Sequence, residues 1–434
     1  MNAVEIIRKK RDLEELSKEE IEFFIKEYSA GRIPDYQASS FLMAIYLNGM
    51  SQREIVDLTM AMAYSGATLD LSAIDGIKVD KHSTGGIGDK VTLVLMPILA
   101  SLGVSVVKMS GRGLGFTQGT IDKLESIPGF RTNISIEEFI NNIKHIGISI
   151  MSQRDDIAIA DKKLYALRDV TSTVESIPLI ASSVMSKKIA SGADKIVLEV
   201  TCGSGSFMDS VERAKVLSET MVNIGKKVGR ETVAVITNMN QPLGRYCGNS
   251  LEIMETIKTL RGEGEEDVMQ VCMVIGAYML KLAGKGDNIA NNFKLIQRQI
   301  ENGEGLKKFK EFIIQQGGNP SILDKPELLN MARYKTPVKS EQSGTVYEMN
   351  CKNIGKAIVN LGGGRIRKED FIDNTVGIEV LKKIGDEVEI GEPLLYIYSN
   401  DESKAKDQVK FLRDSYKLAS IDVQKIEEII DVIE

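Results

Sequence analysis

The strongest constraint on the fold is a pair of glycine-rich loops between residues 79 and 126. Residues 81–89 read KHSTGGIGD, and residues 110–120 read SGRGLGFTQGT. Each loop follows a short apolar run and precedes a segment with helical spacing, as in a strand–loop–helix unit. Glycine lets a backbone approach an anion closely, and free N–H groups at the following helix start can then point at that anion. Both loops are therefore predicted to converge on one phosphate, with charge and hydroxyls from Lys81, Ser83, Ser110 and Thr120.

The apolar pattern along the chain predicts helices first and then alternating strands and helices. Residues 1 to about 65 have helical spacing, and Ser17 to Glu20 form a capping-box sequence. Residues 161–190 and 249–330 return to helical spacing, β-like runs begin near residue 336, and residues 403–415 are predicted as a surface helix. Apolar runs typical of buried parallel strands lie at 77–79, 104–109, 146–151, 195–200 and 232–237.

These patterns predict an α/β fold class with a small all-helical domain, a large mixed α/β domain and a β-rich C-terminal part. We assign residues 1–67 and 160–192 to a discontinuous helical domain. Residues 68–159 and 193–330 form the predicted α/β phosphate-binding domain, and residues 336–434 form a C-terminal β-rich α+β part packed on it. A cleft between the helical and α/β domains is a natural place for a small substrate.

Composition narrows the classes of function. The net charge of −6 gives no basic field that would favour nucleic acid. No run of about 18 apolar residues predicts a membrane span, and the charged N-terminus has no apolar signal core. Four scattered cysteines suit reduced thiols in the cytoplasm. Only His82 and His145 are present, without a histidine–cysteine cluster, so a zinc site is not expected.

Longer motifs give the chain a specific resemblance. The first loop and the aspartate before it resemble the D-K-H-S-T-G-G-x-G-D segment of thymidine and pyrimidine-nucleoside phosphorylases, and the second loop closely resembles their signature. Residues 160–171 (ADKKLYALRDVT), 182–188 (SSVMSKK) and 241–244 (QPLG) continue the match. The resemblance covers nearly the whole chain. It implies a helical domain and an α/β domain that close on the substrate, and a homodimer formed through the helical domain.

The resemblance also implies a reaction and its ligands. The reaction is reversible phosphorolysis of uridine, thymidine, deoxyuridine or a sugar-modified relative to free base and α-(deoxy)ribose 1-phosphate. Inorganic phosphate is the co-substrate, and no organic cofactor is expected. Phosphate-binding residues are Lys81, Ser83, Gly86, Thr92, Ser110 and Thr120; pyrimidine-binding residues are Arg168, Ser183, Lys187, Leu114, Tyr165, Ile180 and Phe207. His82, Arg168 and Lys187 are the implied catalytic residues, with His82 acting as a hydrogen-bond donor or general acid.

The sequence departs from the family pattern near the sugar and phosphate. Phe116 stands where a histidine is usual, Gln118 replaces a glycine, and Asn238 replaces an aspartate. Thr201 and Cys202 begin a segment that usually starts with lysine. Pyrimidine recognition is therefore better supported than the identity of the sugar.

The cation site of bacterial relatives is altered as well. They can hold a monovalent cation near Gly88, Leu243 and Glu255, with a hydroxyl at position 90 and the carbonyl of position 246. Here these positions are Lys90 and Tyr246. We hypothesise that the Lys90 ammonium reaches toward Glu255 and that potassium is dispensable.

Two other readings of the chain remain open. An enzyme resembling anthranilate phosphoribosyltransferase shares the general layout but would need acidic residues for a Mg²⁺–pyrophosphate complex, and no convincing Asp–Glu pair lies beside the loops. A nucleoside-binding paralogue without turnover is the non-enzymatic alternative. Asp161, Asp169 and Glu199 are expected to orient basic neighbours or cap helices rather than to act as acid–base pairs.

Overall fold

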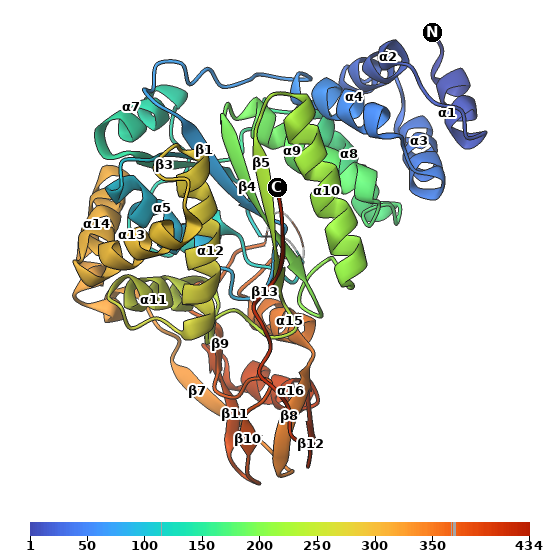
Figure 1. The fold of residues 1–434 in the computed structure, drawn as a ribbon. Helices are drawn as coiled ribbons and strands as arrows, with labels where there is room; N and C mark the ends of the chain where they lie inside the picture. The colour runs from blue at the N-terminus through green and yellow to red at the C-terminus, as the bar shows by residue number, and fades with distance from the viewer. Residues whose placement is uncertain (114, 366, 368–369) are drawn as a thin grey trace.

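The computed structural model describes residues 1–434 except 114, 366, 368 and 369. The helical domain lies beside the upper part of the α/β domain, at the upper right of Figure 1, and the β-rich part lies below the α/β domain, which confirms the predicted fold class. Among the described residues, no helix combines the length and the apolar character that a membrane crossing requires.

The helical domain packs four N-terminal helices against two later ones (Figure 1). Ser17 and Ser51 form capping boxes with Glu20 and Glu54 at two of the helix starts, as the sequence at 17–20 predicts for the first. The shared apolar core includes Phe24, whose ring stacks on Phe41 with centroids 4.1 Å apart. The helices are α1 (Ala3–Arg11), α2 (Lys18–Ser29), α3 (Asp35–Asn48), α4 (Gln52–Ala63), α8 (Ile159–Val170) and α9 (Ile177–Ala190).

A six-stranded sheet forms the centre of the α/β domain, in the order β13-β5-β4-β1-β2-β3. The five strands from β1 to β5 run parallel, and each overlaps one of the five predicted apolar runs. Because parallel strands end at the same edge of a sheet, the loops after β1, β2 and β4 are neighbours. The strands are β1 (Lys78–Ser83), β2 (Ser105–Ser110), β3 (Ile148–Ser152), β4 (Lys195–Cys202), β5 (Thr232–Asn238) and β13 (Ile429–Ile433).

Helices cover both faces of this sheet. α9 and α10 (Val211–Lys227) pack against one face, and α5 (Val91–Ser101) and α12 (Glu266–Leu282) pack against the other (Figure 1). The helical domain thus joins the sheet through α9, whose residues contribute to both cores. The remaining helices of this part are α6 (Thr120–Glu125), α7 (Ile136–Ile146), α11 (Asn249–Leu260), α13 (Ile289–Glu301), α14 (Glu304–Gln315) and the 3₁₀ turns η1 (Pro320–Leu323) and η2 (Pro326–Leu329).

The C-terminal part contains two small antiparallel sheets, β10-β8-β12 and β6-β9-β11-β7. The helix predicted at 403–415 is α16 (Glu402–Arg413), whereas α15 (Cys351–Leu361) lies where β-like runs were expected. The strands are β6 (Tyr246–Cys247), β7 (Tyr334–Lys339), β8 (Gly344–Met349), β9 (Gly377–Val380), β10 (Glu387–Val388), β11 (Pro393–Ser399) and β12 (Tyr416–Ala419).

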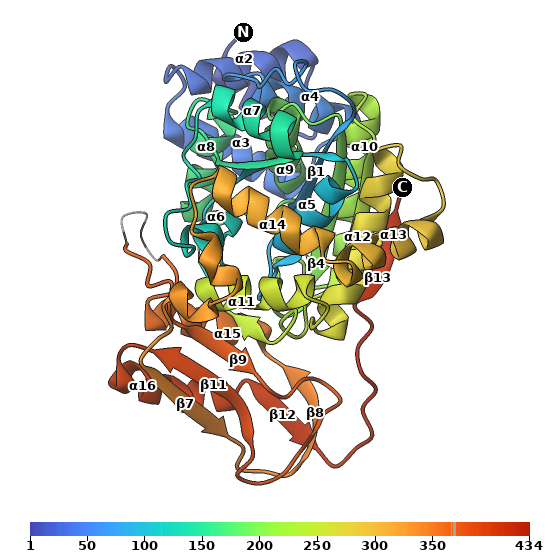
Figure 2. The ribbon, with the colours of Figure 1, turned by 90° about the vertical axis from the view of Figure 1, so that its left-hand side faces the viewer.

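Two strands pair with the sheet of the domain next to their own, which the sequence did not reveal. The last strand, β13, leaves the C-terminal part and pairs antiparallel with β5 at the edge of the central sheet (Figure 2). Conversely, β6 belongs to the α/β domain in sequence and pairs with β9 in a C-terminal sheet. These pairings fix the C-terminal part against the α/β domain.

Candidate active site

A cavity of about 270 Å³ lies where the loops after β1, β2 and β4 face helices α8 and α9. It combines cationic, hydroxyl and aromatic side chains from both domains. It is lined by His82, Ser83, Thr84, Gly85, Arg112, Tyr165, Arg168, Val174, Ile180, Ser183, Val184, Lys187, Phe207, Met208 and Leu217.

Every described residue of the predicted pyrimidine-binding set lines this cavity. They are Tyr165, Arg168, Ile180, Ser183, Lys187 and Phe207. The seventh, Leu114, lies outside the described residues. His82 and Ser83 join them from the end of β1. The cavity therefore combines hydrogen-bond donors with apolar and aromatic side chains.

The Lys187 ammonium is held in place by its neighbours on α8 and α9. Its Nζ lies 2.9 Å from the Asp161 carboxylate and 3.3 Å from the Ser183 hydroxyl, one helical turn earlier. The side chain of Lys187 is 22% exposed, whereas that of Asp161 is 3% exposed. The ammonium thus reaches the cavity while its partner stays in the wall. Asp161 orients a basic neighbour, as expected from the sequence.

The Arg168 guanidinium organises the segment between α8 and α9. It donates to the carbonyl oxygens of Thr173 (3.2 Å), Leu179 (3.1 Å) and Val174 (2.6 Å). A guanidinium has five N–H donors, so these contacts use three and two can point at a bound molecule. Arg168 therefore has both a structural and a potential binding role.

His82 is half-buried at the end of β1 and lies among lysines. Burial, together with the charges of Lys188, Lys108, Lys187 and Lys81, holds the pKa of His82 well below its usual range. The imidazole is consequently uncharged at neutral pH. Of the two roles expected for His82, hydrogen-bond donation from a neutral ring fits this environment, and proton transfer from an imidazolium does not.

Lys81 follows the alternation of β1 and points to the other face of the sheet from His82. Its buried ammonium contacts the Glu199 carboxylate and lies 3.5 Å from Asp89. Burial and the Asp89 charge raise the pKa of Glu199 to about 7, and Lys81 and Lys123 keep the pKa of Asp89 well below its usual range. Glu199 orients a basic neighbour, and the charge on Lys81 is already matched in the absence of phosphate.

The two glycine-rich loops lie next to each other, as predicted. They leave the paired strands β1 and β2. A Cβ on Gly85 would lie 3.8 Å from the Thr117 side chain, which is ordinary van der Waals contact. Lys123 on α6 donates to the Asp89 carbonyl at 2.6 Å and so ties the second loop's helix to the first loop. Of the predicted phosphate set, Ser83 alone is among the lining residues of the cavity. Of the others, Lys81 is buried in β1, Gly86 packs on Met239, Thr92 is buried in α5, Ser110 ends β2 and Thr120 starts α6.

The departures from the family pattern have structural partners, with one exception. Phe116 packs on Phe207 with ring centroids 5.5 Å apart. Thr201 lies 3.1 Å from the Thr84 hydroxyl and donates to the Gly85 carbonyl, so it anchors the first loop. Asn238 accepts from the backbone N–H of Asn240 at 3.0 Å. Both side-chain amide atoms of Gln118 are buried without a hydrogen-bond partner in the described part of the chain.

Lys90 fills the position of the possible monovalent cation. Its Nζ donates to the Leu243 carbonyl at 2.6 Å and lies 2.7 Å from the Glu255 carboxylate. A Cβ on Gly88 would lie only 2.4 Å from the Leu243 oxygen and 3.3 Å from the ammonium. The predicted reach of Lys90 to Glu255 is thus confirmed, and the residues present do not fit an additional ion between them.

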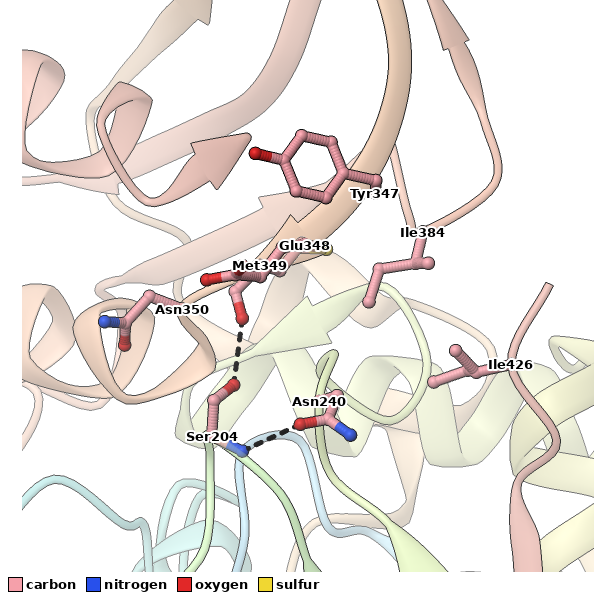
Figure 3. A pocket seen from close by; sticks show the side chains of 8 residues that line it. All are labelled: Ser204, Asn240, Tyr347, Glu348, Met349, Asn350, Ile384 and Ile426. Atoms are coloured by element: carbon pink, nitrogen blue, oxygen red, sulfur yellow. Dashed lines mark hydrogen bonds between the residues drawn. The ribbon is translucent and has the colours of Figure 1, made fainter. Parts of the chain in front are cut away.

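A second cavity, of about 330 Å³, separates the α/β domain from the C-terminal part (Figure 3). Ser204 crosses it by donating to the Met349 carbonyl at 2.9 Å, and its backbone N–H donates to Asn240. Its described lining residues include one carboxylate, Glu348, and no lysine, arginine or histidine. It therefore lacks the charge that an anionic ligand requires, and the smaller cavity is the candidate active site.

Sequence reasoning missed several residues of the candidate site. Arg112 lies within the second loop and could have been found from its position; it is held 3.1 Å from Asp122. The apolar lining residues Val174, Val184, Met208 and Leu217 follow ordinary helix and loop patterns. Nothing in those patterns separates them from residues of the core.

Comparisons with known proteins agree with this arrangement. Residues 4–66 match the helical bundle domain of a glycosyl transferase family, residues 75–306 match its a/b domain, and residues 345–419 match the pyrimidine nucleoside phosphorylase C-terminal domain. The chain is 54% identical to a pyrimidine-nucleoside phosphorylase of Staphylococcus haemolyticus over 96% of both chains. It is 50% identical to one of Geobacillus stearothermophilus over 100% of both chains, and 53% identical to one of Bacillus subtilis over 93% of both.

Among solved structures, anthranilate phosphoribosyltransferase from Thermus thermophilus has a similar fold. The TM-score is 0.60 at 18% identity, over 72% of this chain and 99% of that one. At this identity the likeness concerns the fold alone.

Proposed function

This chain belongs to the pyrimidine-nucleoside phosphorylase family, whose reaction is phosphorolysis of pyrimidine nucleosides, and we propose that it runs this reaction in the 270 Å³ cavity. The observation that carries the proposal is the meeting of Arg168, Ser183 and Lys187 with the first glycine-rich loop in that one cavity. The pyrimidine would lie between these donors and the walls formed by Tyr165, Ile180 and Phe207.

The chemistry requires charge stabilisation more than a covalent nucleophile. In the proposed reaction, the C1′–N bond breaks, the base takes the electron pair, and a phosphate oxygen forms the new bond to C1′. The sugar passes through a state with oxocarbenium character, and the departing pyrimidine is anionic. Lys187 and Arg168 would stabilise that anion, and His82 would donate a hydrogen bond to it. Positioned charges of this kind supply much of the rate enhancement of enzymes.

The phosphate is assigned to the two loops, with Lys81, Ser83, Gly86, Thr92, Ser110 and Thr120 as its contacts. The adjacency of the loops and the buried Lys81 support this assignment. Lys81 must share its charge between the phosphate and its present carboxylate partners, Glu199 and Asp89. Protonation of Glu199 would release part of that charge for the phosphate.

The test of the proposed function is phosphate-dependent release of free base from uridine, thymidine, deoxyuridine, cytidine and sugar-modified uridines. Release that requires phosphate supports the reaction, and the ranking of substrates defines the sugar preference. Binding of uracil or uridine without release from any substrate would instead indicate a nucleoside-binding paralogue.

A pH prediction follows from Glu199. Its pKa is raised to about 7, so the carboxyl is neutral below that pH and ionised above it. Ionisation adds negative charge beside Lys81, and we expect the KM for phosphate to rise about tenfold between about pH 6 and pH 8. In Glu199→Gln this added rise should disappear. Phosphate itself ionises in the same way with both proteins, so its effect on KM cancels when the two are compared. Identical pH profiles of KM in wild type and Glu199→Gln would contradict the assignment of Lys81.

We also propose a homodimer formed through the helical domain, in a cytoplasmic protein. All four cysteines are free and buried, which suits a reducing compartment.

Support for the dimer comes from apolar side chains left exposed on the helical domain: Leu13 is 74% exposed, Tyr36 73% and Leu47 72%. Sedimentation should give a dimer that the double variant Tyr36→Glu, Leu47→Glu converts to monomers. A wild-type protein that sediments as a monomer at micromolar concentration would refute the dimer.

A further inference from the structure

A cluster of three buried charged residues lies beneath the candidate site and has no role in the function proposed above. Asp80 on β1 is contacted by two ammonium groups, Lys188 Nζ at 2.7 Å and Lys108 Nζ at 3.4 Å. Lys188 also donates to the Met109 carbonyl at 3.1 Å, and Lys108 donates to the Lys81 carbonyl. All three side chains are at most 4% exposed.

The cluster contains more positive than negative groups. Two lysines share one carboxylate, and their other contacts are neutral carbonyl groups. Burial, with the charges of Lys188 and Lys81, lowers the pKa of Lys108 to about 7 against the opposing effect of Asp80. As pH falls through neutrality, Lys108 therefore takes up a proton and the cluster gains its excess charge.

The cavity residue His82 lies two residues after Asp80 on β1. Side chains alternate between the faces of a strand, so Asp80 and His82 project from the same face of β1. Lys188 reaches Asp80 from α9, directly after Lys187, which lines the cavity with His82. The charged groups around His82 are Asp80 and Lys81 on β1, Lys108 on β2, Lys187 and Lys188 on α9, Asp161 and Arg168 on α8, and Arg112 in the second loop.

We propose that Lys108, Lys188 and Asp80 are positioning residues for His82, and that their excess positive charge acts together with the burial of the ring to keep its imidazole uncharged in mildly acidic solution. The benefit for catalysis rests on the proposed phosphorolysis, whereas the effect of the cluster on the charge of His82 does not. The lysines repel a positive charge on the His82 ring. In mildly acidic solution the proton therefore binds to Lys108 and not to His82.

An uncharged His82 benefits the proposed reaction. The sugar develops positive charge at C1′, and an imidazolium beside it would repel that charge. A neutral ring can still donate one N–H to the departing base. The buried lysines meanwhile favour the two anions of the reaction, phosphate and pyrimidine. With the cluster in place, His82 donates a hydrogen bond to the base but does not become an imidazolium that could transfer a proton.

The chain offers a direct test because it contains only two histidines. His145 is exposed on α7, so His145→Gln leaves His82 as the single histidine signal in an NMR titration of the full-length protein. In this background we expect the titration midpoint of His82 to lie well below that of an ordinary imidazole. Adding Lys108→Met, which leaves Asp80 paired with Lys188, should raise the midpoint of His82 by one pKa unit or more.

Lys188→Met is the second variant, because it leaves Asp80 with Lys108 and guards against a folding defect in Lys108→Met. An unchanged His82 midpoint in the folded variants would overturn the inference. The pH profile of kcat/KM gives the second readout: in Lys108→Met, activity should fall at acidic pH with the new His82 midpoint. A shifted midpoint without this acidic loss would overturn the link to catalysis. Absence of phosphorolysis in the wild type, with the NMR shift present, would refute the proposed function instead.

Discussion

Lys187→Ala is expected to lower kcat/KM for pyrimidine phosphorolysis about a thousandfold, which corresponds to about 4 kcal/mol of transition-state stabilisation. In the proposed mechanism, the ammonium faces the base, whose negative charge develops as the glycosidic bond breaks. Interactions that strengthen only in the transition state act on kcat more than on substrate binding. The loss should therefore appear mainly in kcat, measured by steady-state release of uracil at saturating phosphate.

Lys187 is a cleaner test than Arg168. The Arg168 guanidinium holds three backbone carbonyls between α8 and α9, so its removal would disturb the cavity wall as well as the base contact. Lys187 instead pairs with side chains, Asp161 and Ser183. Asp161→Asn should give a smaller loss than Lys187→Ala, because it keeps the ammonium and removes one of its positioning contacts.

Lys162→Ala is the matched control on α8. Its ammonium pairs with Asp155 in solvent, 2.5 Å away, with side chains 47% and 82% exposed. Such surface pairs contribute little, so this variant should keep near-wild-type activity. Thermal unfolding of both variants separates lost activity from lost fold. Near-wild-type turnover in a folded Lys187→Ala protein would refute the assigned role of Lys187.

The sequence was sufficient for the parts of the molecule that local patterns encode. Buried parallel strands appear as short apolar runs, so β1 to β5 could be placed before the structure was known. The cavity residues Arg168, Ser183 and Lys187 lie in long ordered motifs, and resemblance identified them together. The ion pair between Lys90 and Glu255 was also predictable, because the resemblance implies that position 90 lies near the carboxylate of Glu255.

The remaining features depend on contacts that no local pattern contains. β13 has the same residue types as other short strands, and only its pairing with β5 shows that it completes the central sheet. Lys108 and Lys188 appear in sequence as ordinary lysines, yet both are buried against Asp80. Their charge balance becomes visible only when β1, β2 and α9 are brought together.

Removing the Lys90 ammonium is expected to produce a large loss of stability. Lys90 is fully buried, and the charges of Glu255 and Glu252 raise its pKa above the usual range despite that burial. Glu255 also accepts the backbone N–H groups of Arg245 at 2.8 Å and Tyr246 at 3.1 Å. Lys90→Met would leave this carboxylate buried without its cation, which lowers the free energy of unfolding by about 3–5 kcal/mol.

The matched control is the double variant Lys90→Met, Glu255→Gln, which removes both charges. Breaking a buried ion pair is much more harmful than replacing both partners. We therefore expect the double variant to be more stable than Lys90→Met alone. Urea unfolding followed by circular dichroism measures both. Equal losses in the single and double variants would show that Lys90 contributes through packing rather than through its charge.

The response of activity and melting temperature to potassium tests whether Lys90 replaces a bound cation or only lies near a cation site. In the wild type, the ammonium already contacts Leu243 and Glu255, so neither activity nor melting temperature should change when potassium replaces sodium. Lys90→Thr empties that space and supplies a hydroxyl. Added potassium should then raise the melting temperature in proportion to the logarithm of its concentration above its Kd, because a ligand that binds only the folded state stabilises it. Wild-type activity that vanished without potassium and returned on its addition would refute the replacement. A response confined to Lys90→Thr would mean that the Lys90 ammonium takes the place of a bound cation between Leu243 and Glu255.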